Sequence, residues 1–367
     1  MPGRRGADPG RRAPTIYDVA RECGVAASTV SRAFARPGRV NPETEARIRA
    51  AAQRLGYRVN PQARALQTGK TGMIALVVGD ITNPVNFDII LGGEAAAGEA
   101  GYTMVLADAQ ESPRTERDAI NRVVRNVEGL VLSSSRISDS AIRTAAKLCP
   151  TVIVNRAFSD VPCVVTDHSR GMRRAVEHLG ELGHSSLTYI AGPEASWADG
   201  MRWRATKDAC HELELRLRRL GPYPPTIAGG LAAVEDLRRA PTTGVLAYND
   251  LLAMGLIRGL ARIGIHVPGD VSVVGFDNIF GADFGTPGLT TVAAPLRALG
   301  SAAVQHLIAQ LRGVAPRTGG PMVLPVQLLV RGSTAQRSRK RTSPAWGTTR
   351  VSGSADQAST STSAGSR

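Results

Sequence analysis

The chain has 367 residues, a net charge of +14 and 43% hydrophobic residues, enough to bury a sizeable core in two or three folded units. It has no run of about 18 apolar residues, which excludes a membrane-spanning helix, and its arginine-bearing N-terminus lacks the apolar stretch of a secretory signal. The four scattered cysteines form no zinc or disulfide pattern, so we expect a cytoplasmic protein with no metal and no cofactor.

The positive charge is concentrated near the two ends of the chain. Residues 14–71 carry ten basic and four acidic side chains, whereas residues 72–330 carry 24 basic and 25 acidic ones. Residues 331–367 carry seven basic groups and one acidic group. A general preference for arginine would spread this charge evenly. The distribution therefore favours a basic nucleic-acid-binding module joined to a neutral body.

Both ends of the chain have the composition of disordered segments. Residues 1–13 are rich in Arg, Gly and Pro, residues 334–367 are rich in Ser, Thr and Gly, and neither segment shows apolar periodicity. We expect two disordered basic tails. The C-terminal one has no leucine heptads, which argues against a tetramer formed through it.

Residues 14–58 predict three short helices. Thr15, with an acid three residues later, begins the first, and Gly24 ends it. The second helix follows over residues 25–34, and Asn41 caps the third. Two helices joined by a tight glycine turn and followed by a third are typical of a helix-turn-helix unit.

Residues 59–71 form a linker whose candidate helix, 60–66, is too short to be helical alone in water. From residue 72 onward, apolar runs alternate with amphipathic helices, which predicts parallel sheets with helices on both faces. About 260 residues is large for one such sheet, so we expect two similar lobes. The predicted strands are 74–78, 103–107, 129–132, 152–154, 164–166, 187–191, 244–247, 271–276, 290–293 and 323–331. The predicted helices include 87–100, 114–127, 171–182, 201–212, 251–263 and 296–311.

Polar residues follow four of these predicted strands. Ligands of open parallel sheets bind beyond the carboxyl ends of the strands, so these residues predict a cleft rich in hydrogen-bonding groups. For each residue alone, capping of the next helix or turn is an equally good explanation. The residues concerned are Asp80, Asn155 with Arg156, Asn249 with Asp250, and Asp277.

Several motifs follow one another in a fixed order along the chain. TIYDVARECGVAASTVSRAF (15–34) and ARAL (63–66) are followed by GPEASWADGMRWRA (192–205), NDLLAMG (249–255), VPGDVSVVGFDN (267–278) and PGLTTV (287–292). Together they resemble the LacI/GalR repressor family over about residues 15–333. The resemblance implies an α/β protein with a helix-turn-helix head (14–58), a hinge helix (59–71) and a two-lobed core (72–333). That core would consist of doubly wound parallel sheets, as in periplasmic sugar-binding proteins.

By this resemblance the chain crosses between the lobes three times, near 167–171, 293–296 and 321–324. One lobe then comprises about 72–166 and 297–321, and the other about 168–293 and 324–333.

The resemblance implies that the second helix of the head reads DNA bases in the major groove. Arg32 would donate a forked pair of hydrogen bonds to guanine, Ser28 would donate or accept, and Ala27 would offer an apolar contact. Further DNA-contact candidates, mainly to phosphates, are Thr15, Thr29, Ser31, Arg39 and Asn41. Ordinary helix-surface polarity is the alternative for these groups. Ala26 stands where the family usually has a capping serine, so the helix is expected to begin a residue later or to be capped elsewhere.

The hinge helices of a homodimer would pair in the minor groove, where Leu66 would wedge between base steps and Ala63 would allow close approach. A two-fold dimer should read a pseudo-palindromic operator. The alternative for Leu66 is packing onto the core.

The resemblance also implies a small-molecule effector between the lobes. Asp277 would accept hydrogen bonds, Arg202 and Arg156 would donate in forks, and Asn249 would do both. Such a set suits a sugar or sugar derivative. The remaining candidates are Asn155, Ser196, Trp197 and Phe87. Phe87 stands alone where relatives often have paired aromatics, and Ala294 replaces a frequent glutamine, so a nucleobase, a nucleoside or another metabolite is the alternative effector.

These features predict a DNA-binding transcriptional regulator, a repressor whose effector changes the angle between the lobes and so controls operator binding. It would act in the cytoplasm at the nucleoid. A transport-type binding protein would share the core but lack residues 1–71. An enzyme would need a catalytic motif, and the sequence has no GxSxG, P-loop, HExxH or GxGxxG after a strand.

Overall fold

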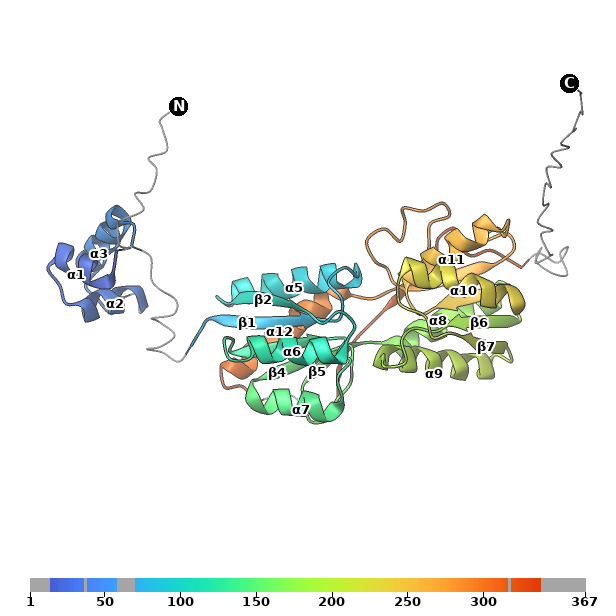
Figure 1. Cartoon of the computed structure of the whole chain (residues 1–367), viewed down its shortest axis with the longest axis horizontal. Helices are drawn as coiled ribbons and strands as arrows, with labels where there is room; N and C mark the ends of the chain where they lie inside the picture. Colours follow the sequence, from blue (N-terminus) through green and yellow to red (C-terminus); the bar gives the residue numbers. More distant parts are fainter. Residues whose placement is uncertain (1–13, 36–37, 58–69, 316–317, 338–367) are drawn as a thin grey trace, which may run out of the picture. The chain divides into compact units, whose positions relative to one another are not determined.

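A computed structural model describes residues 14–35, 38–57, 70–315 and 318–337 (Figure 1). Contacts divide the chain into an N-terminal head and a larger α/β core. The predicted hinge helix, with Ala63 and Leu66, lies outside the described residues, as do 1–13 and 338–367. No helix among the described residues is long and apolar enough to cross a membrane.

The head consists of α1 (Ile16–Cys23), α2 (Ala27–Ala35) and α3 (Pro42–Leu55). Their apolar faces meet around Val19, Val30 and Ile48, which are fully buried. The Asp18 carboxylate accepts hydrogen bonds from Thr15 N at 2.8 Å and Thr15 Oγ1 at 2.7 Å, which stabilises the start of α1.

The second helix begins two residues later than the predicted start at residue 25. Gly24 adopts a left-handed φ of 62°, and Val25 N donates to Ala20 O at 3.1 Å, so these residues form the turn rather than the helix. α2 begins directly after Ala26, whose carbonyl accepts from Thr29 N at 2.9 Å.

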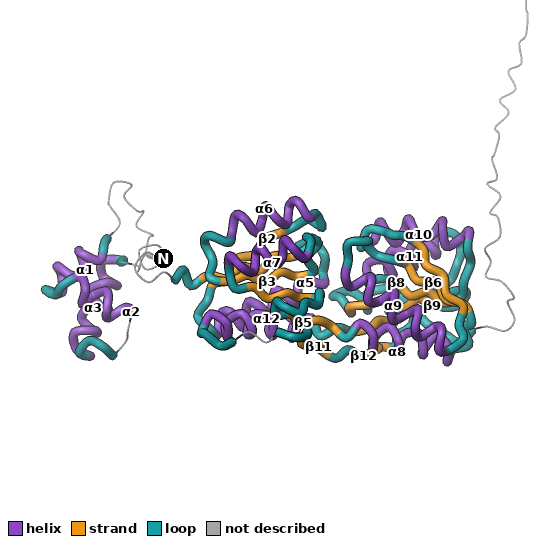
Figure 2. Tube along the Cα trace, turned by 90° about the horizontal axis from the view of Figure 1, so that it is seen from below, coloured by secondary structure: helices purple, strands orange, loops and turns teal. Residues whose placement is uncertain are grey.

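The core contains two six-stranded sheets, each with helices on both faces (Figures 1 and 2). The first has the order β11-β5-β4-β3-β1-β2 and the second the order β12-β10-β9-β8-β6-β7. Neighbouring strands whose residue-by-residue pairing is defined run parallel, except that β10 and β12 are antiparallel.

The strands of the first sheet are β1 (Met73–Val78), β2 (Thr103–Asp108), β3 (Gly129–Ser133), β4 (Thr151–Val154), β5 (Cys163–Thr166) and β11 (Met322–Leu324). Its helices are α5 (Val85–Glu99), α6 (Pro113–Val123), α7 (Asp139–Leu148) and α12 (Leu296–Leu311). We call this sheet with its helices lobe 1.

The strands of the second sheet are β6 (Ser186–Ile190), β7 (Arg216–Leu220), β8 (Gly244–Ala247), β9 (Ser272–Asp277), β10 (Thr290–Ala293) and β12 (Gln327–Leu329). Its helices are α8 (His168–Glu181), α9 (Trp197–Glu212), α10 (Ile227–Arg239) and α11 (Asp250–Arg262). We call this sheet with its helices lobe 2.

The third passage between the lobes differs from the prediction. The chain crosses between β11 and β12, at 325–326, because residues 322–324 still pair with β5 in lobe 1. The single strand predicted over 323–331 is therefore wrong. Pro325 has no N–H to donate to a strand ladder, and the chain changes sheets there.

The C-terminal tail also begins later than predicted. Residues 334–337 are part of lobe 2, since Ala335 N donates to Ser272 Oγ at 3.1 Å and Arg337 N donates to Leu182 O at 2.8 Å. The polar composition of this segment predicted disorder, because backbone hydrogen bonds leave no signal in the sequence.

Glycines bring α5 and α12 into close contact. A Cβ on Gly92 would lie 1.9 Å from the carbonyl oxygen of Arg297, and a Cβ on Gly300 would lie 2.0 Å from that of Ile89. By contrast, a Cβ on Gly98 of α5 would meet no atom within 4 Å.

We predict that Gly92→Ala lowers the free energy of unfolding of the core by about 1–3 kcal/mol, because the added methyl group forces the two helices apart. The matched variant Gly98→Ala should be neutral or stabilise the helix by about 0.5–1 kcal/mol. Urea unfolding followed by circular dichroism measures both. Equal stability of the two variants would contradict this packing.

Candidate functional site

The carboxyl ends of strands from both lobes surround one small polar cavity. Its volume is about 30 Å³, far below the roughly 300–1,000 Å³ of typical small-molecule sites, so a larger ligand requires the cavity to open. Lobe 1 contributes Gly79, Asn83, Val85, Asn86, Glu111, Ser134, Arg136 and Asn155, and lobe 2 contributes Ala198, Arg202, Pro225, Tyr248, Asn249 and Asp277.

Backbone strain is concentrated at this cavity. Seven described non-glycine residues have positive φ, and four of them line it: Glu111 at 52°, Ser134 at 53°, Asn155 at 57° and Asp277 at 106°. Each lies at or shortly after the end of a strand. Such conformations cost about 1–3 kcal/mol each and are concentrated at functional sites. The strain identifies the cavity as the candidate site of the core.

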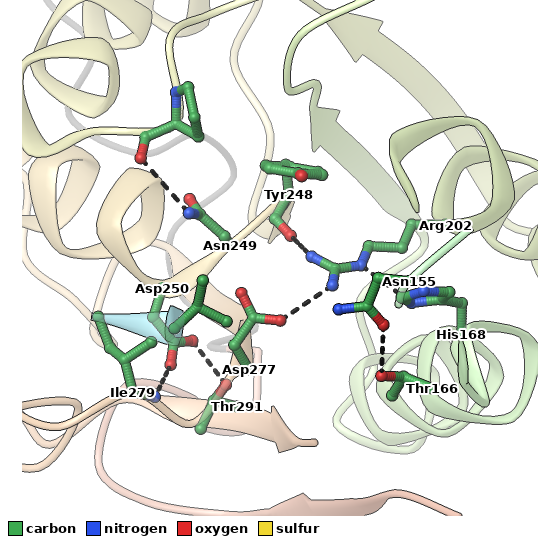
Figure 3. Close-up of polar contacts among 12 residues, drawn as sticks. Asn155, Thr166, His168, Arg202, Tyr248, Asn249, Asp250, Asp277, Ile279 and Thr291 are labelled. Atoms are coloured by element: carbon green, nitrogen blue, oxygen red, sulfur yellow. Dashed lines mark hydrogen bonds and ion pairs between the residues drawn. The ribbon is translucent and has the colours of Figure 1, made fainter. Parts of the chain in front are cut away.

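In lobe 2 the cavity is organised around a buried ion pair. Arg202, on α9, is 3% exposed and donates to Asp277 Oδ1 at 2.9 Å, to His168 Nδ1 at 3.3 Å and to the Tyr248 carbonyl (Figure 3). Its guanidinium also lies 3.6 Å from the centre of the Phe276 ring. Burial raises the pKa of Asp277, and Arg202 opposes that rise.

Two neighbouring side chains hold this half of the site in place. Asn249 lines the cavity, but its Oδ1 accepts from Leu252 N at 3.0 Å and so caps α11. Asp250 accepts from Ile279 N at 2.9 Å and from Thr291 Oγ1 at 2.6 Å. Burial, aided by the nearby Asp277 carboxylate, raises the pKa of Asp250 to about 8. Asp250 fixes the loop that follows β9.

Lobe 1 contributes a second ion pair that the sequence analysis missed. Arg136 Nε donates to Glu111 Oε2 at 2.7 Å, and the Arg136 side chain is only 6% exposed. Burial lowers the pKa of Arg136, but Tyr248 of lobe 2 and Glu111 together raise it, so the guanidinium remains charged. These residues follow β2 and β3 within loops, and their pairing across 25 positions leaves no signal in the sequence.

Asn86 and Asn155 complete the lobe 1 side. Asn86 Nδ2 donates to Asp80 O at 2.7 Å, whereas the buried Asn86 Oδ1 has no hydrogen-bond partner in the structure. Asn155 Oδ1 accepts from Thr166 Oγ1 at 3.0 Å (Figure 3). Within the described ranges, no three His, Cys, Asp or Glu side chains are close enough to hold a metal ion.

Four predicted effector residues lie outside the cavity lining. Arg156 donates to the carbonyls of Ser135 and Ile137 and to Asp139, so it braces loops of its own lobe. Ser196 caps α9 and forms a hydrogen bond with the Tyr248 hydroxyl at 3.0 Å. The Trp197 ring packs against His168, with the two ring centres 5.8 Å apart. Phe87 is 44% exposed on α5.

The head presents unpaired cations on its surface. Arg21, Arg49 and Arg54 form ion pairs with carboxylates of the head. Arg32 on α2 and Arg39 before α3 are exposed and form no ion pair with any described residue. They are therefore available to an anionic partner.

The other predicted DNA-contact residues differ in exposure. Ser28 is exposed, whereas Ala27, Thr29 and Ser31 are half-buried. Asn41 Oδ1 accepts from Glu43 N at 2.9 Å as the cap of α3, and the Thr15 hydroxyl donates to Asp18. Tyr17, which was not among the predicted contacts, is 69% exposed in the first turn of α1 and lies off its apolar face.

Two family models match the chain, one in the head and one in the core. Residues 15–60 match bacterial regulatory proteins of the lacI family, and residues 176–334 match a periplasmic binding protein-like domain. The HTH-type transcriptional repressor CytR of Escherichia coli K12 is 32% identical over 337 residues, which are 88% of this chain and 96% of that protein. The chain belongs to the LacI family. The family and fold class predicted from the motifs are confirmed.

Other relatives of this LacI-family chain are also regulators rather than enzymes. The HTH-type transcriptional regulator DegA of Bacillus subtilis strain 168 is 31% identical, over 88% of this chain and 98% of its own. The lac repressor dimer bound to operator and the anti-inducer ONPF is 25% identical with a TM-score of 0.80, covering 88% of this chain and all of that one. The CelR–cellobiose complex is 29% identical with a TM-score of 0.65, covering 87% and 99%.

We predict that Arg202→Met lowers the free energy of unfolding by about 3–5 kcal/mol at neutral pH, because it leaves Asp277 buried without its cation. The pKa of Asp277 rises further in this variant, so the loss should shrink as the pH falls and Asp277 takes up a proton in the folded state. Urea unfolding at pH 8 and pH 5 measures this change.

The double variant Arg202→Met/Asp277→Asn is the control for the pair. It should cost less than the two single substitutions added together, because neither charge is then left alone. Additive costs would show that the pair contributes no coupling energy.

Proposed function

We propose that this protein is a transcriptional repressor that binds a pseudo-palindromic operator as a homodimer and responds to a small-molecule effector, a sugar or sugar derivative. The observation that carries the proposal is the combination of the exposed, unpaired Arg32 on α2 of the head with a strained polar cavity between two sheets of the core. Such a protein acts in the cytoplasm, at the nucleoid.

On the DNA side, α2 enters the major groove. Arg32 reads guanine with its forked donors, and the exposed Ser28 lies one turn earlier on the same helix. Arg39 contacts phosphate, and the exposed Tyr17 adds a contact from α1. Ala63 and Leu66, by family resemblance, belong to a hinge that inserts into the minor groove.

Dimerisation is supported by apolar side chains left on the surface of the core. Phe87 and Leu91 are 44% and 49% exposed and lie one turn apart on α5. A second copy of the chain that covers them gives Phe87 a role in the dimer rather than in the effector cavity. A symmetric dimer requires two operator half-sites in inverted orientation.

On the effector side, the lining favours a hydroxyl-rich ligand. Carboxylate, amide and guanidinium groups all line the cavity, which suits a ligand with several hydroxyl groups. Tyr248 is the one aromatic residue among the lining residues, so a nucleobase finds little stacking surface. The solved CelR complex holds cellobiose, and a LacI-family regulator from Enterococcus faecalis V583, 30% identical with a TM-score of 0.67 and covering 72% of this chain, holds ribose.

The cavity is linked to the segments that pass between the lobes. Arg202 donates to His168, which begins α8 directly after the first crossing, and the Asp277 carbonyl accepts from Ala294 N at the second crossing, at 3.3 Å. A ligand that moves Arg202 or Asp277 therefore moves the crossings, and with them the angle between the lobes.

We predict that Arg32→Ala removes the preference for guanine at two symmetry-related positions of the operator, one in each half-site. It should weaken operator binding by about 1–3 kcal/mol. The operator is first obtained by selection from random duplex DNA with the wild-type protein, and affinities are then measured by fluorescence anisotropy. Arg21→Ala, which removes an exposed arginine that is paired with Asp18, is the control and should retain the preference. An unchanged selected sequence with Arg32→Ala would contradict the reading role, and a wild-type protein that selects no sequence would overturn the repressor function.

A further inference from the structure

The charged groups that line the cavity cancel one another within each lobe. Glu111 pairs with Arg136 in lobe 1, and Asp277 pairs with Arg202 in lobe 2. The side chains of Arg136, Arg202 and Asp277 are less than a tenth exposed, and that of Glu111 is 26% exposed. An anionic ligand entering this cavity therefore meets no free cation and two carboxylates.

We propose that the Glu111–Arg136 pair makes the cavity selective for an uncharged, hydroxyl-bearing ligand and excludes phosphorylated or carboxylated ligands of the same shape. The proposal rests on the effector role of the cavity given above and assigns the specificity to a pair of lobe 1 residues.

The local backbone fixes the position of the Glu111 carboxylate. Its backbone has a φ of 52°, and its Oε1 lies 2.9 Å from the position that a Cβ on Gly79 would take. A side chain at position 79 would thus displace the carboxylate. Glycine at the end of β1 and the left-handed turn after β2 together place Glu111 over the strand end, facing Arg136.

The position of Arg136 is fixed from its backbone outward. Glu116, 2% exposed on α6, accepts from Arg136 N at 2.8 Å, and the Arg136 guanidinium reaches both Glu111 and Tyr248 of lobe 2. Because a buried guanidinium cannot lose its proton, removal of Glu111 leaves a free positive charge in the cavity. A substitution at position 111 should therefore convert the cavity into an anion site.

Asn86 shows what the ligand must supply. Its Oδ1 is buried and unpaired, and the residue, 3% exposed, lines the cavity. Asn86 Nδ2 already donates to Asp80 O, so the free atom is an acceptor that needs a donor from the ligand. A sugar hydroxyl supplies that donor, whereas an ionised phosphate brings acceptors.

The test uses the full-length protein and matched pairs of neutral and phosphorylated sugars: ribose and ribose 5-phosphate, glucose and glucose 6-phosphate, and fructose and fructose 6-phosphate, with cellobiose as a further neutral probe. Thermal shift identifies the binders and calorimetry measures their dissociation constants. We expect at least one neutral sugar to bind, and its phosphorylated partner, where it has one, to bind at least tenfold more weakly. Stabilisation by no neutral member, or tighter binding of a phosphorylated member, overturns the proposal.

Glu111→Gln is the decisive variant, and Asp118→Asn, which removes an exposed charge on α6 of the same lobe, is its control. The ratio of phosphorylated to neutral affinity should rise at least tenfold in Glu111→Gln and stay unchanged in Asp118→Asn. An unchanged ratio in a folded Glu111→Gln protein overturns the proposal. If Glu111→Gln does not fold, Arg136→Met is used instead. It leaves the Glu111 carboxylate without its cation, so the ratio of phosphorylated to neutral affinity must fall.

Operator affinity measured on the same preparations separates this proposal from the repressor function. A protein that binds its operator and fails the ratio test loses only the assignment of charge selectivity. A protein that passes the ratio test without binding DNA retains the selective cavity and loses the repressor function.

Discussion

The buried Arg202–Asp277 ion pair is the interaction on which the lobe 2 half of the site depends. Two charges removed from water are tolerated only when each has a partner and further hydrogen bonds, and Arg202 meets this need with Asp277, His168 and the Tyr248 carbonyl. These contacts join α9, the ends of β8 and β9, and the start of α8. The pair therefore fixes the strand ends that line the cavity.

The same pair lies where the proposed ligand site meets a segment that passes between the lobes. The Arg202–Asp277 pair of lobe 2 lies close to the point where the chain passes into lobe 1. From lobe 1, Arg136 lines the same cavity and interacts with Tyr248 of lobe 2. The cavity is nearly closed by these side chains, at about 30 Å³. In the proposed function, a ligand of sugar size rearranges them, which couples its binding energy to the angle of the lobes.

The sequence predicted the parts of the fold that rest on apolar periodicity and turn chemistry. The buried central strands and the helix caps Asn41 and Asn249 leave direct signals, and so do Arg202 and Asp277 through family motifs. β7, with the sequence RLRRL, was missed because an edge strand can be mostly charged.

The site itself was only half predictable. Asn155 and Arg156 are adjacent in the chain, yet Asn155 lines the cavity while Arg156 points to the carbonyls of its own lobe, because side-chain direction depends on the local backbone and on nearby acceptors. Glu111 and Arg136 lie in loops that carry no periodic pattern. Only the folded strand ends bring them together, so their role emerges from the structure.

The most direct test measures the operator affinity of the full-length protein with and without the neutral sugar that binds its cavity. Allosteric coupling energies are typically about 1–3 kcal/mol, so we predict a change in operator affinity of at least about fivefold on saturation with that sugar. The change should be absent with a non-binding sugar of the same panel. An operator affinity that stays the same while the cavity is saturated would contradict the link between the ion pairs, the crossings and DNA binding.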